Sequence, residues 1–274
     1  MNIVVPVKIA IMKELESCAA SLGIGLSLGL MGAGGSILTI PVFVYILKRD
    51  PVSSSIYSMF VVGLSSMVGS IQSISNKLVD FKVMMRFGIP SVTGVFIARK
   101  LIFPFIPAQL FSMGSFVLSK NVLFMLCLSG LMFLSGLRIL KPANRDQSLP
   151  GDEPASILLL LRGLFVGIIT GLMGIGGGFL IVPALYFLAK LPVKKAISTG
   201  LPVITANSLF SFLSSYGSVN LDWLLLIKFS LGAILGILMG TKLSRTMPAN
   251  YLKIFFGWFI LGLSFYIVYK QFFL

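Results

Sequence analysis

The chain has 274 residues, of which 57% are hydrophobic and only 11% are charged, and its mean hydropathy is +1.01. Soluble domains carry about a quarter charged residues, so this composition excludes an ordinary soluble protein and predicts a multi-pass membrane protein. The net charge of +14 comes from basic residues in short breaks between apolar runs, which favours lipid headgroups over nucleic acid as the partner.

Apolar segments follow one another along the chain, and most have the length of about twenty residues that crosses a bilayer. They cover residues 17–47, 53–75, 82–105, 121–140, 157–189, 196–216, 223–243 and 251–272. The polar stretch at 142–156 separates them into two groups. We therefore expect an all-α polytopic protein with a first membrane repeat at 1–141, a linker at 142–156 and a second repeat at 157–274. The start of the chain, MNIVVPVKIAIMKE, lacks the features of a removable signal peptide.

The second half of the chain repeats the first. LMGAGGSILTIP at 30–41 matches LMGIGGGFLIVP at 172–183, an offset of 142, and the same offset places DF at 80–81 on DW at 222–223. This ordered series indicates that a four-segment unit was duplicated, which is a common construction of secondary transporters. The stretch AQLFSMGSFVLSK in the first half has no counterpart, and we expect it to form an interfacial loop or a short helix.

The first segment of each repeat has an unusual length. Cys18 to Leu47 is 30 residues, about 45 Å as one helix, which is long for one crossing and short for two. Glycine weakens a helix interior, so we expect a break at each glycine cluster, with the two pieces either crossing together or re-entering. Re-entry divides Lys and Arg 13 to 9 across the membrane and crossing divides them 11 to 11. The positive-inside rule favours re-entry, which would relate the repeats by an inverted pseudo-two-fold.

The glycine clusters predict a substrate site for a small anion. A helix that starts inside the membrane presents free N–H groups and partial positive charge, and glycine adds no bulk between backbone and ligand. The predicted residues of this site are Gly32, Gly34, Gly35, Ser36, Gly174, Gly176, Gly177 and Gly178. The alternative is that these glycines only let helices pack closely.

Polar residues on the second helix of each repeat add to this site. Ser66 and Ser70 align with Asn207 and Ser211, at a spacing that puts each pair on one helix face. They either line a polar route for the anion or connect helices by hydrogen bonds. Thr205, on the same predicted helix as Asn207 and Ser211, favours the interpretation that this helix lines a route for the anion.

No cofactor or metal site is predicted, and an enzyme is excluded because the chain has no histidine and no CxxC pair. The paired Asp80 and Asp222 are expected to cap helices. Arg86 and Lys228 either reach to headgroups or draw anions into a vestibule. All acidic residues fall near segment ends, so proton coupling would use a proton carried by the substrate, and Na⁺ held by backbone carbonyls is the other possibility.

At these residues the sequence resembles a known family. The paired GAGGSILTIP and GIGGGFLIVP stretches in a duplicated frame of this length resemble the sulfite exporter TauE/SafE family, of the 4-toluene sulfonate uptake permease superfamily of bacterial permeases, from about Ser17 to Tyr269. The resemblance implies export of small sulfur-containing anions, such as sulfite or organosulfonates, across the bacterial inner membrane. The related thiosulfate transporters use cysteines in their conducting path, and Cys18 and Cys127 form no comparable arrangement.

The sequence thus predicts a secondary transporter that works by alternating access around a glycine-lined anion site. The alternatives are a passive anion channel, suggested by the lack of a buried acidic residue for coupling, and a membrane scaffold that transports nothing. The expected partners are the small anion and the lipid bilayer, with no nucleic acid. A homodimer is left open.

Overall fold

The computed structural model describes residues 4–31, 34–105, 109–113, 116–140, 156–174, 177–243 and 249–273. The linker expected at 142–156 therefore lies outside the described residues, except for residue 156. Within these ranges the chain is nearly all helical, which confirms the predicted fold class at that level. The helices of the first half are α1 (Val4–Met31), α2 (Gly34–Pro41), the π-helix η1 (Val42–Ile46), α3 (Pro51–Ser75), α4 (Phe81–Ile97), the π-helix η2 (Ala98–Ile102), the 3-10 helix η3 (Phe103–Phe105) and α5 (Lys120–Leu140). Those of the second half are α6 (Ser156–Met173), α7 (Gly178–Leu188), α8 (Val193–Ser215), α9 (Trp223–Leu243) and α10 (Ala249–Phe273).

The expected apolar segments coincide with helices, and the long first segment of each half is divided, into α1, α2 and η1 in the first half and into α6 and α7 in the second. Among the described residues, four helices are long and apolar enough to cross a membrane: Pro51–Ser75, Phe81–Phe105, Lys194–Ser215 and Trp223–Leu243. Shorter apolar helices run over Glu16–Leu30, Gly35–Ile46, Val122–Arg138 and Ile157–Met173. The start of the first helix differs from expectation. Helix α1 begins at Val4, whereas the apolar run starts at residue 17.

The two paired aspartates begin helices, as the sequence predicts. The Asp80 carboxylate accepts a hydrogen bond from the Val83 N–H at the start of α4. The Asp222 carboxylate accepts one from the Leu225 N–H at the start of α9. Each carboxylate satisfies a backbone donor that has no partner within its helix, so the capping prediction is confirmed.

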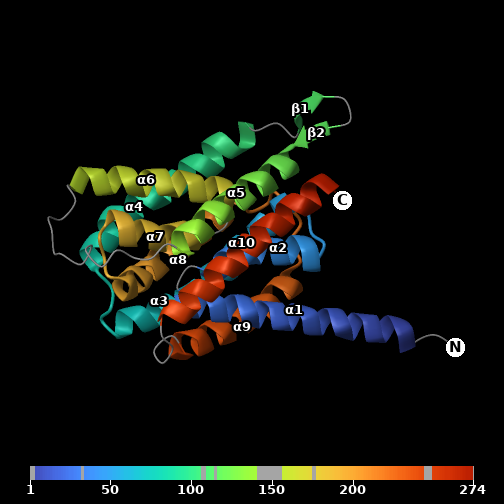
Figure 1. Ribbon diagram of the computed structural model, residues 1–274, viewed down its shortest axis with the longest axis horizontal. Helices are drawn as coiled ribbons and strands as arrows, with labels where there is room; N and C mark the ends of the chain where they lie inside the picture. Colours follow the sequence, from blue (N-terminus) through green and yellow to red (C-terminus); the bar gives the residue numbers. More distant parts are fainter. Residues whose placement is uncertain are drawn as a thin grey trace.

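The stretch around residues 109–119 forms strands, so the prediction of a loop or short helix there is wrong. Strands β1 (Gln109–Met113) and β2 (Phe116–Ser119) pair antiparallel, with Met113 opposite Phe116 and Ser112 opposite Val117. Aromatic and β-branched residues suit a pleated surface better than a helix of this length. The strand pair lies beside the start of α5 (Figure 1).

The helices pack in pairs that join the two halves of the chain. Figure 1 shows α1 running along α9, α6 along α4, and α5 along α10. Helices α3 and α8 pack on each other and are the most enclosed of the candidate spans, with 72% and 61% of their apolar windows buried. Apolar clusters around α2 and α7 fill the space between these pairs.

Glycines set the close approach within two of these pairs. A Cβ added at Gly25 of α1 would overlap the carbonyl of Ala233 in α9, and one added at Gly167 of α6 would overlap the carbonyl of Ser91 in α4. Only glycine allows backbones to come this close, as in other helix pairs of membrane proteins.

Helices α3 and α8 run antiparallel, because residues later in α3 contact residues earlier in α8. The Tyr57 hydroxyl of α3 accepts a hydrogen bond from the Asp222 N–H just after α8, and Ser70, further along α3, bonds Thr205 within α8. The Asp80 N–H, after the end of α3, donates to Thr199 near the start of α8. The molecule therefore has an Asp222 end and an Asp80 end.

Candidate functional site

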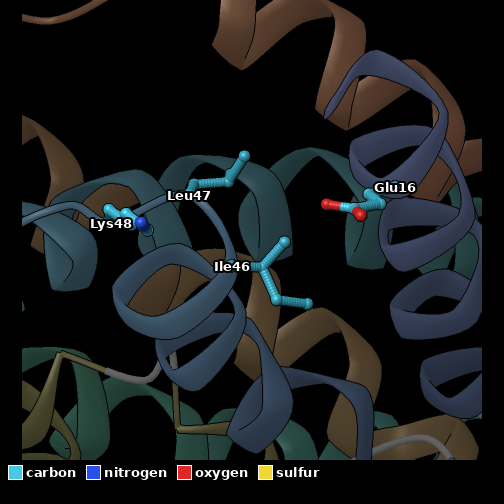
Figure 2. Close-up of a pocket in the computed structure, with 4 residues that line it drawn as sticks. All are labelled: Glu16, Ile46, Leu47 and Lys48. Carbon is cyan, nitrogen blue, oxygen red and sulfur yellow. The ribbon is translucent and has the colours of Figure 1, made fainter. Parts of the chain in front are cut away.

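The first segment of each half folds back on itself as a helical hairpin. Helix α2 packs along α1, and the pocket in Figure 2, of about 130 Å³, is lined by Glu16 of α1 together with Ile46, Leu47 and Lys48 at the end of η1. The chain thus returns to the level of Glu16 after turning. In the second hairpin the Arg162 guanidinium of α6 donates to the Leu188 carbonyl of α7 at 2.9 Å, so α7 also ends close to where α6 begins.

The two hairpins open toward opposite ends of the molecule. The first opens at the Asp222 end, where Arg49, just after η1, forms an ion pair with Asp222 at 3.3 Å. The second opens at the Asp80 end, where Lys195 at the start of α8 pairs with Asp80 at 3.1 Å. Their returning helices α2 and α7 contact each other inside the molecule. Leu180 of α7 contributes to the apolar clusters on both sides of this contact.

The turn of the second hairpin needs glycine for its backbone conformation. Gly174, just after α6, has a φ of 63°, and Gly177, which precedes α7, has a φ of 78°. This left-handed region is costly for residues with a Cβ. Leu180 and Ile181 donate their N–H groups back to the Gly177 carbonyl, which starts α7 at this point.

In the first hairpin Gly35 lies in a close packing contact. A Cβ added at Gly35 would overlap the Ile24 carbonyl of α1, so Gly35 lets α2 lie against α1. Ser36 beside it is fully buried. Gly34 and Gly178 begin α2 and α7, whereas the predicted Gly32 and Gly176 lie outside the described residues.

The predicted polar residues of α3 and α8 meet different neighbours. Ser66 and Ser70 of α3 both bond the Thr205 hydroxyl of α8 at 3.0 Å. The Asn207 side-chain amide instead donates to the Ser91 hydroxyl of α4 at 2.7 Å, while its Oδ1 is buried without a partner among the described residues. Ser211 is buried. The serines thus connect helices, and the Asn207 Oδ1 remains able to accept a hydrogen bond.

A buried arginine that the sequence analysis did not single out lies at the second turn. Arg99 of η2 is 4% exposed, and a Cβ added at Gly174 would overlap its Nη2. Nη2 lies 3.5 Å from the Ser55 hydroxyl of α3, a weak hydrogen bond, and Nε has no partner among the described residues. The guanidinium also stands 4.8 Å from the centre of the Phe103 ring. In the sequence, Arg99 and Lys100 form a basic pair at the end of an apolar run, which is the usual pattern of topology signals.

The paired aspartates also carry contacts between the halves that the sequence did not predict. Burial by itself would raise the pKa of the Asp80 carboxyl, but the Val83 N–H and the Lys195 ammonium outweigh it and hold that pKa below its usual range. Neither aspartate lies within a candidate span. Within the described residues no group of three or more Asp, Glu, Cys or His side chains is placed to hold a metal ion.

Comparison with known proteins adds a family and several relatives. Residues 17–267 match the family described as sulfite exporter TauE/SafE. A probable membrane transporter protein of Xylella fastidiosa strain Temecula1 is 25% identical over 263 residues, covering 90% of this chain and 92% of its own. The probable membrane transporter protein YunE of Bacillus subtilis is 26% identical, and the match covers 81% of this chain and 85% of YunE. The probable membrane transporter protein MJ0441 of Methanocaldococcus jannaschii is 27% identical, and the match covers 81% of this chain and 84% of MJ0441. No solved structure matches the chain.

Proposed function

The chain belongs to the sulfite exporter TauE/SafE family and is an integral membrane transporter, and from this premise we propose that it exports small sulfur-containing anions, such as sulfite or organosulfonates. The membrane is the bacterial inner membrane, and transport is secondary. The substrate class comes from the family description, and the hairpin geometry supports an anion at the centre of the molecule.

The proposed membrane topology is an inverted repeat. The α1–α2 and α6–α7 hairpins re-enter the membrane from opposite faces, while the remaining long helices cross it. Two observations support this arrangement. The α1–α9 contact at Gly25 and Ala233 has a counterpart, at an offset of 142, in the α6–α4 contact at Gly167 and Ser91. Helices α3 and α8 are the second helices of the two repeats and run antiparallel, as corresponding helices of inverted repeats must.

The observation that carries the proposal is the meeting of α2 and α7 just after the two glycine turns. A helix that begins inside the membrane presents N–H groups and the positive end of its dipole, and such an end binds an anion without a charged side chain. In the proposal, the amides near Gly34, Gly35 and Ser36 and near Gly174, Gly177 and Gly178 face a shared cavity in the occluded or open states. The hairpins move against the α3–α8 pair to expose it to one face at a time.

Coupling in this proposal uses protons or Na⁺. No acidic residue of the described chain lies within a candidate span, so a proton would cross on the substrate, as hydrogen sulfite, or Na⁺ would bind backbone carbonyls near the turns. The lack of such a carboxylate also favours the second candidate function, a passive anion channel. The two differ in whether an imposed ion gradient drives accumulation.

The test is flux of radiolabelled sulfite and taurine in proteoliposomes of the full chain, with and without imposed proton or Na⁺ gradients. Uphill movement excludes a channel, dissipative flux alone indicates one, and no flux of any sulfur anion refutes the proposal. Gly177→Ala forces a Cβ into the left-handed turn and is expected to slow flux by about five- to thirtyfold, given the cost of ~1–2 kcal/mol for that conformation. Gly262→Ala is the matched control, because nothing lies within 4 Å of an added Cβ there.

A further inference from the structure

We infer that Arg99, beside the Ser55 hydroxyl and the turn at Gly174, forms the binding site for the oxyanion group of the transported molecule. This inference rests on the proposed function and adds a charged residue to a site that was predicted from backbone amides alone. The group bound there is a single negatively charged headgroup, such as a sulfonate or hydrogen sulfite.

Arg99 carries a buried charge that no ion pair of the described residues compensates. Arg99 is 4% exposed, and no carboxylate of the described residues lies within ion-pair distance of it. An unpaired charge inside a membrane protein is costly, and such residues usually mark a substrate or ion path. An anion that binds here supplies the missing partner.

The Arg99 side chain lies in different surroundings from that of the neighbouring residue. Lys100 is exposed, although it carries the same charge and lies one position along the same helix. An arginine that only anchored the helix would extend its side chain to the headgroups, as long basic side chains do. Arg99 lies about 9 Å beyond the middle of the Phe81–Phe105 span, at 1.5 Å per residue. Its side chain nevertheless turns inward, toward the α6–α7 turn.

The guanidinium of Arg99 has the geometry to bind an oxyanion. Nε and Nη2 form the edge of the group that binds two oxygens of a carboxylate, sulfonate or phosphate at once. Nε has no partner among the described residues, and Nη2 has only the weak 3.5 Å bond to Ser55. This edge therefore has donors for two oxygens of one anion, while the Ser55 hydroxyl beside it donates to the Val52 carbonyl at 2.8 Å and holds Nη2 as an acceptor.

The glycine turn and the arginine depend on each other. The Arg99 Nη2 occupies the space that a Cβ of residue 174 would fill, so the guanidinium can reach the turn only because this residue is glycine. The α7 helix begins four residues later, at Gly178, and directs its positive end into the same region. Two sources of positive potential thus converge at the second hairpin.

The site is asymmetric across the duplication. At the offset of 142, the position of Arg99 corresponds to Thr241, which has no charge. One guanidinium offers one full positive charge, so the site favours a monoanion such as methanesulfonate over a dianion such as sulfate. A neutral molecule of similar shape, such as dimethyl sulfone, should not bind.

The test compares Arg99→Gln with the matched control Lys100→Gln, because both remove one positive charge from adjacent positions. Equilibrium binding of sulfite, methanesulfonate, sulfate and the zwitterionic sulfonate taurine is measured on the purified full chain, and flux of the same compounds is measured separately in proteoliposomes. Arg99→Gln should weaken binding of the monoanions by at least about tenfold, the size expected for loss of a charge-assisted bidentate contact. Lys100→Gln should bind like the unchanged protein, and Arg99→Lys should fall between them.

Stability without ligand separates a binding role from a structural one. Removal of an unpaired buried charge should leave the melting temperature of Arg99→Gln unchanged or raise it, while the stabilisation by added anion is lost. A large drop in melting temperature of Arg99→Gln without ligand would mean that the guanidinium supports the fold, and would overturn the inference.

The remaining outcomes distinguish the two proposals. If Arg99→Gln and the unchanged protein bind the anions with equal affinity, the Arg99 site is refuted. The proposed transport function is then tested by the flux assay alone. Absence of binding for every anion also refutes the Arg99 site. Binding that depends on Arg99 without any flux keeps the site and refutes the transporter.

Discussion

The glycine contacts that hold α1 to α9 give a sharp test of the scaffold. Gly23 and Gly25 lie two positions apart in α1, yet a Cβ at Gly23 would meet nothing within 4 Å, whereas a Cβ at Gly25 would overlap the Ala233 carbonyl. Replacing either glycine by alanine gives the same gain of about 0.5–1 kcal/mol from the lost freedom of the unfolded chain. The difference between the two variants is therefore the strain of the contact itself.

That strain should be near the upper end of the range for overpacking, about 3 kcal/mol. Overpacked sites cost about 1–3 kcal/mol when side chains can adjust, but the atom in the way here belongs to the backbone and cannot rotate aside. At about 2–4 °C per kcal/mol for a protein of this size, Gly25→Ala should melt about 6–12 °C below Gly23→Ala.

Thermal unfolding of both variants in the same detergent measures this difference, with intrinsic tryptophan fluorescence as the signal. Gly167→Ala, which faces the Ser91 carbonyl in the α6–α4 pair, should lose as much as Gly25→Ala if the two halves pack alike. Equal melting temperatures for Gly23→Ala and Gly25→Ala would refute the close approach of α1 and α9.

Three further predictions concern the ends and the centre of the molecule. The pKa of Asp80 is lowered in the folded state, so its carboxylate stabilises the protein above the usual pKa near 4. This stabilisation is lost as the pH falls through the lowered pKa. Asp80→Asn should therefore flatten the acid side of a plot of melting temperature against pH. Lys48 and Lys190 end the two hairpins with φ values of 52° and 53°, so replacing either by glycine should stabilise the protein by about 0.5–1 kcal/mol in a thermal melt. Thr205→Val removes the bonds to two serines of α3 and should cost about 1 kcal/mol without changing anion affinity, as measured by unfolding and by equilibrium binding.

The helices could be predicted from the sequence because segment length and apolar character are local properties. The same holds for the caps at Asp80 and Asp222, since a carboxylate just before an apolar run has few other roles. The β1–β2 pair was missed because a short run of aromatic and aliphatic residues is equally consistent with a membrane-surface helix. Pairing between the two strands decides the outcome, and a single segment does not reveal it.

The candidate site was harder to predict because one residue type has two physical uses in it. Gly174 and Gly177 are needed for a left-handed backbone, whereas Gly35 is needed for contact with α1. The sequence shows the same letter in each case. Arg99 was missed for a different reason, since its burial depends on the α6–α7 turn, which lies far along the chain. Next to Lys100, it has the pattern of a topology signal.

Glycine clusters occur in both halves of the sequence, but Arg99 has no charged counterpart at the offset of 142, and this difference has a physical consequence for the proposed site. Two arginines, one at each turn, would pay the cost of burying an unpaired charge twice, and one monoanion would leave one of them uncompensated. With Arg99 at the second turn and the uncharged Thr241 at the matching position in the second half of the sequence, a single bound monoanion neutralises the buried charge. The loaded protein is then electrically balanced in its interior while the empty one is not. Movement of the hairpins past the apolar clusters should accordingly be easier when the anion is bound, which is the condition that a secondary exporter requires.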